Sequence, residues 1–362
     1  MAIHRYRLVI AALAMASTAV VAAAGSAGAA THQSSRVKAS TPNKLYFNSK
    51  GIPNLSGMTI SIANSAGSAH IGDAHIYAVE QFLISWGASV SLVKGSGNLM
   101  EEAVAGGSEN VCTSPVANSL DAGLVAIGPN QTSVAYALLV PKSITSLSQL
   151  AGKKYADDFA TTGENVDYPL WAAAAKLGKF SLSGMQLVTT GAEANSFNQV
   201  VSGNVSAAWV DPSTVSAAGS GFHSLTTGAK VAPTYADSMT FATSAWLNAH
   251  PATAEAIDLA WIASAKQFDN YRGAWARNAY AYTSGTNSYA TLNSAYAQLR
   301  AIGGFGVRES SFSRQAVAVN FQIAKSLGVI TPLGNRPLSE IAKTGPWTAA
   351  WNQYAAHKNS FS

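Results

Sequence analysis

Apolar and polar positions in the first half of the chain alternate with the periods of strands and helices. Residues 58–63 (MTISIA) combine alternation with β-branched side chains, which predicts a buried strand. Apolar residues then recur at helical spacing over 74–86, where Gly87 ends the pattern, and 90–93 predicts a second strand. This order of strand, loop, helix and strand is typical of a parallel sheet flanked by helices.

The same succession of signals occurs a second time. After a short helix at 99–104 and a strand at 110–112, the apolar run 134–140 (VAYALLV) predicts a strand at the centre of a sheet. The second cycle has strands at 153–156, 185–188 and 205–210 and helices at 169–177 and 197–201. Because the residue identities of the two cycles do not match, we predict two similar α/β lobes and no sequence repeat.

Beyond Met239 the pattern becomes helical. A proline stands where a first helical residue belongs, and one apolar face runs over 252–271. Further helices are expected near 288–302, 312–327 and in the final GPWTAAWNQYAA segment. We expect these C-terminal helices to pack on the first lobe.

The N-terminus has the pattern of a secretory signal peptide. Arg5 and Arg7 precede an apolar run over 8–24, and Ala27-Gly28-Ala29 forms a small-x-small cleavage site. An uncleaved membrane anchor is the alternative, but the run is short and rich in alanine for one. We therefore expect residues 1–29 to be removed, residues 30–43 to form a flexible leader, and the protein to be periplasmic or extracellular.

Cysteine content and charge narrow the class of protein. Cys112 is the sole cysteine, so the chain has neither an intrachain disulfide nor a lipidation cysteine at the cleavage site. The net charge of +5 falls to +3 when Arg5 and Arg7 are removed, and only 11% of the residues are charged. No run of Lys and Arg is present, so we expect no nucleic-acid partner. About 330 residues remain after cleavage, which favours two domains.

The segment SITSLSQLAGKK at 143–154 contains a Gly-Lys pair that suggests a phosphate-binding loop. Such a loop requires a glycine at position 147 and Ser or Thr at 154, where the chain has Leu147 and Lys154. The segment resembles instead the start of the second lobe in type II solute-binding proteins of bacterial transporters. In that family the corresponding motif is Ile-x-Ser-Leu-x-Asp-Leu-x-Gly-Lys-Lys, and Gln149 takes the place of the aspartate.

The resemblance is greatest to the binding proteins for aliphatic sulfonates, nitrate, taurine and thiamine-precursor pyrimidines. It extends over GGSENVCTSP, SGNVSAAWVDP and NAHPATAEAIDLAWIASAKQF, and it covers about residues 58–268. It implies an α/β, two-lobed type II periplasmic-binding-protein fold, with lobe 1 at 44–140 plus 238–362 and lobe 2 at 141–237. Two loops, NSAGSAHIGDAHIY and KGSGNLMEEAVAGG, also resemble solute-binding subunits of tripartite, ion-driven carboxylate transporters.

The resemblance implies a function and partners as well. We expect capture of a small polar or heterocyclic ligand and its delivery to a membrane transporter permease, by a monomer that holds no metal and no cofactor. An enzyme of the same fold, acting on a small cyclic or pyrimidine-like substrate, is the alternative.

In a two-lobed α/β protein the ligand lies at the carboxyl ends of the strands. Hydroxyl and amide groups there can orient a small ligand, although each can equally cap a helix. By this argument the candidate ligand-binding residues are Ser65, Ser68, His70, Ser114, Thr161, Thr162, Asn165, Trp209, Asp211 and Phe241.

The distribution of arginine bears on the class of ligand. The nine arginines stand at positions 5, 7, 36, 272, 277, 300, 308, 314 and 336. Residues 37–271, which form most of both predicted lobes, therefore contain no arginine that could hold an anion in a guanidinium fork. The candidate loops carry acids instead, with Trp209 and Phe241 as aromatic faces. Acidic and aromatic groups together favour a neutral heterocycle or a cation. A sulfonate held by backbone N–H groups and hydroxyls stays open.

Catalytic and metal motifs are weak in this chain. His70, Asp73 and His75 do not have the spacing of a zinc motif. Cys112 lies on a predicted strand without a catalytic signature, and no Gly-x-Ser-x-Gly elbow occurs. These features favour a binding protein, while convergence of His70 with an acid of the second lobe would favour an enzyme.

Overall fold

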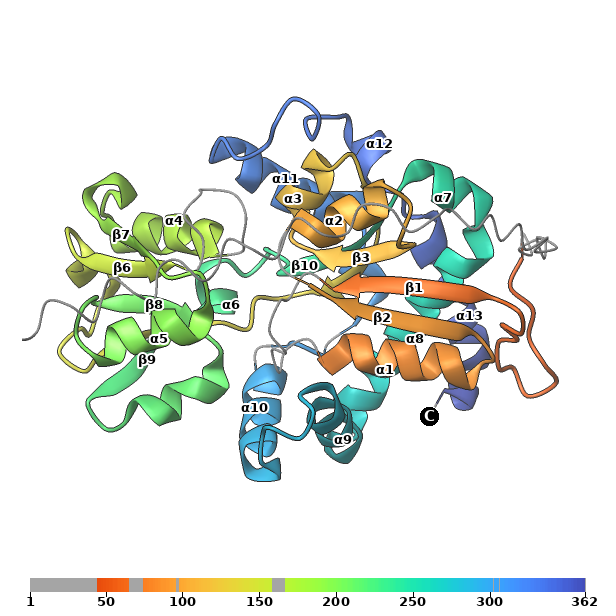
Figure 1. Cartoon of the computed structure of the whole chain (residues 1–362), viewed down its shortest axis with the longest axis horizontal. Coiled ribbons are helices and arrows are strands. Elements are labelled where there is room, and N and C mark those ends of the chain that lie inside the picture. The colour runs from red at the N-terminus through yellow and green to blue at the C-terminus, as the bar shows by residue number, and fades with distance from the viewer. Residues whose placement is uncertain are drawn as a thin grey trace, which may run out of the picture. The chain divides into compact units, whose positions relative to one another are not determined.

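The strands form two five-stranded mixed sheets (Figure 1) in a computed structural model that describes residues 44–64, 74–95, 98–157, 167–301, 303–305 and 307–361. The predicted signal peptide and leader lie outside these residues. Within the described residues, no helix has both the length and the apolar character needed to cross a membrane.

The first sheet has the strand order β2-β1-β3-β10-β4. Its strands are β1 Thr59–Asn64, β2 Ser89–Lys94, β3 Val111–Ser114, β4 Val125–Gln131 and β10 Ser238–Ala242. β1 is parallel to β2 and β3, whereas β10 is antiparallel to both β3 and β4. The carboxyl ends of β1, β3 and β4 therefore lie at the same edge as the start of β10.

The second sheet has the order β7-β6-β8-β5-β9. Its strands are β5 Ala137–Pro141, β6 Lys154–Asp157, β7 Gln186–Thr189, β8 Ala207–Val210 and β9 Phe222–Thr227. β6 is parallel to β7 and β8, and β5 is antiparallel to β8 and β9. The predicted end of lobe 1 at residue 140 needs correction, because β5 pairs within the second sheet. The chain passes between the sheets before Ala137.

Helices cover both faces of each sheet (Figure 1). We call the first sheet with its helices the first half of the molecule, and the second sheet with its helices the second half. The helices of the first half are α1 Ala74–Ser85, α2 Asn98–Ala105, α3 Val116–Asp121, α7 Ser244–Ala249, α8 Pro251–Asn270, α9 Arg272–Tyr282, α10 Tyr289–Ala301, α11 Arg314–Ser326, α12 Leu338–Ile341 and α13 Gly345–His357. In the second half they are α4 Asp167–Gly178, α5 Glu193–Val201 and α6 Gly228–Val231. Short 3₁₀ turns are η2 Leu147–Leu150, η3 Leu182–Gly184, η4 Pro212–Ala218, η5 Glu309–Ser311 and η6 Lys358–Ser360.

The core of the first half is continuous with the C-terminal helices. Side chains of β1, β3 and β4 belong to one buried cluster with residues of α8, α9, α10, α11 and α13. Its aromatic part includes Trp261, Phe268, Trp275, Phe305 and Trp347. These large side chains bury much apolar surface, which fixes the C-terminal helices on the first sheet.

The second half has two smaller cores, one on each face of its sheet. Leu138 and Trp209 pack with Trp171 of α4 on one face, while Leu139 and Val210 pack with α5 on the other. Neighbouring residues of one strand thus face opposite sides, as the period of a strand requires. All of these strand residues are buried because helices cover both faces.

The segment ahead of β6 has the local structure that the resemblance implies. Gln149 Oε1 accepts hydrogen bonds from the backbone N–H groups of Thr145 (2.6 Å) and Ser146 (3.0 Å). Together with the Ser146 side chain this forms a capping box at the start of η2. The prediction of a turn and cap is confirmed, and glutamine serves here in place of aspartate.

Gly128 permits a close approach between β4 and α8. A Cβ atom at this position would collide with Oδ1 of Asp258, which is fully buried. Burial, and secondarily Glu255, raises the pKa of Asp258 well above its usual range, which favours the protonated form of this carboxyl group. Close packing of β4 against α8 therefore explains why a glycine stands at position 128.

Candidate functional site

The carboxyl ends of the strands in the first sheet carry amide and hydroxyl groups. We call this the first carboxyl edge; its residues are Asn64, Thr113, Ser114, Asn130 and Ser238, and all of them are buried. Thr113 Oγ1 donates a hydrogen bond to Asn64 Oδ1 (3.1 Å), and Asn130 Nδ2 donates to Ser238 Oγ (2.9 Å). These bonds fix the orientation of neutral polar groups at the end of the sheet.

A lysine also lies at this edge. Lys94 pairs in register with Asn64, and its ammonium group stands 3.7 Å from the ring centroid of Tyr282. The same group donates a hydrogen bond to the Tyr282 carbonyl (3.1 Å), while Asn64 Nδ2 donates to Tyr282 Oη (2.8 Å). The last residue of α9 thus connects the C-terminal helices to the first carboxyl edge.

Ser114 is hydrogen-bonded to a buried carboxyl group. Its hydroxyl donates a hydrogen bond to Glu101 Oε1, and Glu101 Oε2 is buried with no partner in the described part of the chain. Burial is the main cause that raises the pKa of Glu101, which is opposed by the Ser114 hydrogen bond. The raised pKa favours the neutral form of Glu101 relative to an exposed carboxyl group.

The second sheet presents a different set of groups. We call its residues Asp157, Thr190, Glu193, Ser196 and Asp211 the second carboxyl edge. Thr190 N donates to the Asp157 carbonyl (3.0 Å), and the hydroxyls of Thr190 and Ser196 lie 2.6 Å apart. Asp211 N donates to Glu193 Oε1 (2.7 Å). Three carboxyl groups make this edge acidic, in contrast to the first.

Both chain connections between the sheets run from one carboxyl edge to the other. β4 ends at the first edge with Gln131, and β5 starts at the second edge with Ala137. Six residue steps span at most about 20 Å. The return connection runs from Thr227, at the second edge, to Ser238, at the first. The connectivity therefore keeps the two edges near each other.

Six of the ten predicted ligand-binding residues lie outside the described residues. They are Ser65, Ser68, His70, Thr161, Thr162 and Asn165. Ser114 and Asp211 lie at the first and second carboxyl edges, as predicted from their positions after strands. The ligand contacts themselves stay predictions.

Trp209 and Phe241 lie within the cores of the two halves. Trp209 is 1% exposed and its ring meets that of Trp171 edge-on, and Phe241 is fully buried in the first core. Both side chains therefore pack in the hydrophobic cores beside the sheets.

The predicted ligand-binding residues include Ser114 of the first edge but omit its other members and the three residues that contact them, Lys94, Glu101 and Tyr282. Asn64 and Lys94 each directly follow a strand predicted from the sequence, which is the signal that could have identified them. Glu101 and Tyr282 come from helices, and no local pattern relates them to the ends of the strands.

The environment of Cys112 does not activate a nucleophile. Cys112 is fully buried, and burial, followed by the charge of Glu101, raises the pKa of its thiol well above the usual range. A nucleophilic cysteine requires the opposite shift, because the thiolate is the reactive form. No group of three or more His, Cys, Asp or Glu side chains suited to a metal occurs among the described residues.

Comparison with known proteins identifies the fold. No protein-family model matches the chain, and no curated protein matches it. A ligand-binding component of an ABC-type import system from Staphylococcus aureus, with zinc bound, is similar with a TM-score of 0.66 at 12% identity, over 81% of this chain and 99% of that one. The periplasmic aliphatic sulphonate binding protein SsuA from Escherichia coli gives 0.62 at 16% identity, over 75% and 87%.

A third similar structure is the alkanesulfonate-binding protein SsuA from Xanthomonas axonopodis pv. citri bound to MOPS. Its TM-score is 0.57 at 15% identity, over 77% of this chain and 96% of that one. The predicted fold class is confirmed: the chain has the α/β fold of the solute-binding proteins of ABC-type importers, with two mixed sheets flanked by helices.

Proposed function

We propose that the protein is the exported solute-binding component of an ABC-type import system. It captures a small polar or heterocyclic solute between the two carboxyl edges and delivers it to a membrane permease. The observation that carries this proposal is the connectivity, since both connections between the sheets join one carboxyl edge to the other. The fold shared with ligand-binding components of importers supports it.

The groups at the two edges favour a solute that is neutral or carries a positive charge. The second edge holds Asp157, Glu193 and Asp211, and the described residues of both edges include Lys94 as their cation. Lys94 already engages the ring and carbonyl of Tyr282. An anionic solute would therefore meet acids on one side and a single committed lysine on the other.

Capture requires the two halves to move relative to each other. The connections at 132–136 and 228–237 are the segments that absorb a hinge rotation in this type of fold. We expect the solute to stabilise the closed form because it contacts both edges at once.

A thermal-shift screen of the purified exported protein tests the proposal. Three groups of compounds are compared: sulfonates including MOPS, amines and other cations, and neutral heterocycles. A solute at 100 times its dissociation constant adds about 2.7 kcal/mol to the free energy of unfolding. We expect a clear shift from a cation or heterocycle and recovery of that compound unchanged. A compound that is consumed during the assay would point to an enzyme instead.

Variants locate the site of the solute found in this way. Asp211→Asn, Ser114→Ala and Thr162→Ala are expected to weaken its binding about tenfold each while the protein stays folded. Glu340→Gln, at an exposed position on α12, is the matched control and is expected to bind like the parent. Parental affinity in all three variants would place the solute elsewhere and overturn the proposed site.

A further inference from the structure

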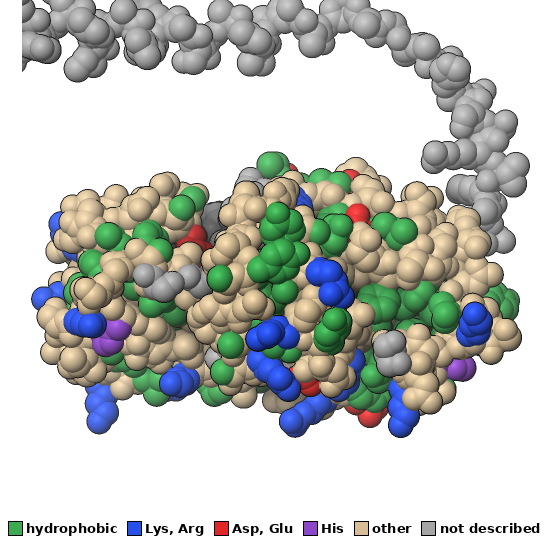
Figure 2. Space-filling view, turned by 90° about the horizontal axis from the view of Figure 1, so that it is seen from below, with side chains coloured by type: hydrophobic (Ala, Val, Ile, Leu, Met, Phe, Trp, Pro, Cys, Tyr) green, Lys and Arg blue, Asp and Glu red, His purple; other side chains and the backbone are tan. Residues whose placement is uncertain are grey.

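The arginines that the structure describes lie between residues 272 and 336, in the C-terminal part of the chain, and two of them share a pocket. Arg272 begins α9 and Arg300 lies in the last turn of α10. In Figure 2, which views the molecule from the side of α9 and α10, Lys and Arg side chains gather near the middle of the face.

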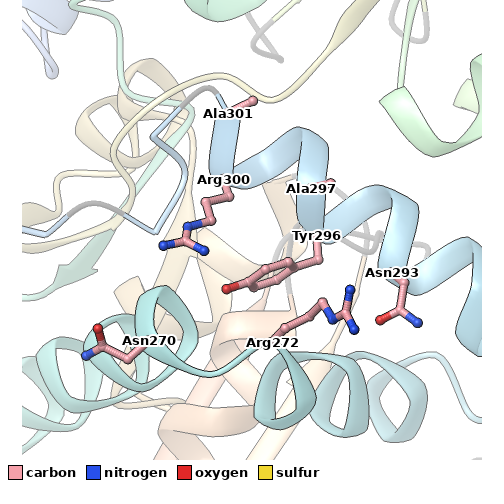
Figure 3. Close-up of a pocket in the computed structure, with 7 residues that line it drawn as sticks. All are labelled: Asn270, Arg272, Asn293, Tyr296, Ala297, Arg300 and Ala301. Carbon is pink, nitrogen blue, oxygen red and sulfur yellow. The ribbon is translucent and has the colours of Figure 1, made fainter.

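The pocket lies between the junction of α8 with α9 and the side of α10. It has a volume of about 580 Å³ and is open to solvent. Tyr296 lines it, with the guanidinium groups of Arg272 and Arg300 on opposite sides of the ring (Figure 3). Asn270 and Asn293 add side-chain amides to the lining. A volume of this size suits a small molecule.

The two guanidinium groups retain donors for a ligand. Arg300 Nε stands 3.8 Å from Asp269 Oδ1, which is beyond hydrogen-bond distance, and these side chains are 60% and 44% exposed. An exposed ion pair of this kind contributes little. Arg272 makes no hydrogen bond or ion pair with any residue that the structure describes. Tyr296 Oη is already used, because it donates to the Phe268 carbonyl (2.7 Å).

We propose that this pocket binds a small molecule with two acidic groups, of the dicarboxylate class. One acid would accept hydrogen bonds from Arg272 and the amide of Asn293, and the other from Arg300. Guanidinium groups pair with carboxylates through parallel N–H donors, which gives such a site its preference for acids. Because the two guanidiniums lie on opposite sides of Tyr296, a compound with one acid reaches only one of them.

This site does not depend on the proposed solute-binding function. Helix α9 runs from Arg272 in the pocket to Tyr282 at the first carboxyl edge, a rise of about 15 Å. Binding at the pocket and binding at the edges can therefore be separated by mutation.

Calorimetric titration of the purified exported protein with succinate, at low ionic strength, tests the proposal. Acetate serves as the one-acid comparison and inorganic phosphate as a compact anion. We expect saturable succinate binding that is at least about tenfold tighter than that of acetate or phosphate. Arg272→Gln and Arg300→Gln are each expected to weaken it about tenfold. Both residues are exposed, so the variants should unfold at the parental temperature without succinate.

Matched variants separate this site from general charge and from the carboxyl edges. Arg314→Gln removes an exposed arginine at the start of α11 and is expected to bind succinate like the parent. Asp211→Asn is expected to do the same. Equal affinity for acetate and succinate, or parental affinity in Arg272→Gln and Arg300→Gln, would overturn the proposal. A loss of succinate binding in Asp211→Asn instead would assign the anion to the carboxyl edges.

Discussion

The two halves of the molecule share one strand arrangement but differ in how their cores are built. Each sheet has three parallel strands followed by an antiparallel strand and a fifth strand. The antiparallel strand is β10 in the first sheet and β5 in the second, and each is the strand with which the chain enters from the other half. Each sheet is thus completed by a strand that directly follows a connection between the halves.

The cores of the two halves differ in size. The first sheet shares a single large core with the C-terminal helices, whereas the second sheet has two small cores on opposite faces. A small core has fewer alternative contacts to compensate for a lost side chain. The second half should therefore be the less stable unit, although its topology is the same.

Paired tryptophan variants test this difference and should give the largest effects. Trp171 of α4 and Trp275 of α9 are both fully buried in aromatic surroundings. Replacement by alanine should cost about 3–5 kcal/mol in either place. In Trp171→Ala, hydrogen exchange should accelerate in β5–β9 with the first sheet still protected. In Trp275→Ala the loss should spread through the first sheet. Equal loss of protection in both sheets of Trp171→Ala would contradict a separate second unit.

A buried histidine makes the first core sensitive to acid. His75 lies among the rings of Trp261, Phe268 and Phe305, and burial lowers its pKa to about 4. Between pH 6.5 and 4 the unfolded chain binds a proton at this residue that the folded chain does not. The free energy of unfolding should therefore fall by about 3 kcal/mol as the pH decreases from 7.5 to 4.

The substitution His75→Leu should remove this part of the acid sensitivity. Urea unfolding at pH 7.5, 6, 5 and 4 measures it, with His357→Leu on α13 as the control. The control should keep the full loss of stability at low pH. A pH dependence that is the same in His75→Leu and the parent would show that His75 does not carry it.

The sequence predicted most of the fold because local period and order determine it. The parallel strands and their helices follow from the alternation in 58–94 and its second occurrence in 153–210. Three strands, β4, β9 and β10, escaped prediction. β4 contains Gly128 and Pro129, which usually interrupt strands, and β9 (FHSLTT) lies mostly half-buried at an edge of its sheet. The pairing partner of β5 is a long-range property that its apolar pattern does not contain.

The site was less predictable because it is assembled from distant segments. Ser114 and Asp211 follow strands, so their position at a carboxyl edge could be inferred. Trp209 and Phe241 occupy interior positions because strands covered on both faces bury every side chain. Tyr282 reaches Asn64 across 218 residues of sequence, which no motif announces.

Glu101 and its exposed neighbour Glu102 provide a comparison within one helix. Burial raises the pKa of Glu101. At a pH between the unfolded and the folded pKa, the folded chain therefore keeps a proton that the unfolded chain releases. The stabilising contribution is full below the unfolded pKa and is lost as the pH rises through the folded pKa. Glu101→Gln should therefore be more stable than the parent at pH 8, and this advantage should shrink toward pH 5. Thermal unfolding at both pH values measures it, and Glu102→Gln should track the parent at each.

The contrast between the carboxyl edges gives the last and smallest effect. The first edge carries Lys94 and the second carries Asp211, and the solute identified in the screen should discriminate between them. For a neutral or cationic solute, Lys94→Gln should change affinity less than about threefold, whereas Asp211→Asn should weaken binding about tenfold. A sulfonate solute would reverse the order, because its charge is attracted to Lys94 and repelled by the second edge. Calorimetry of the two variants with the same solute therefore decides which edge determines the charge preference.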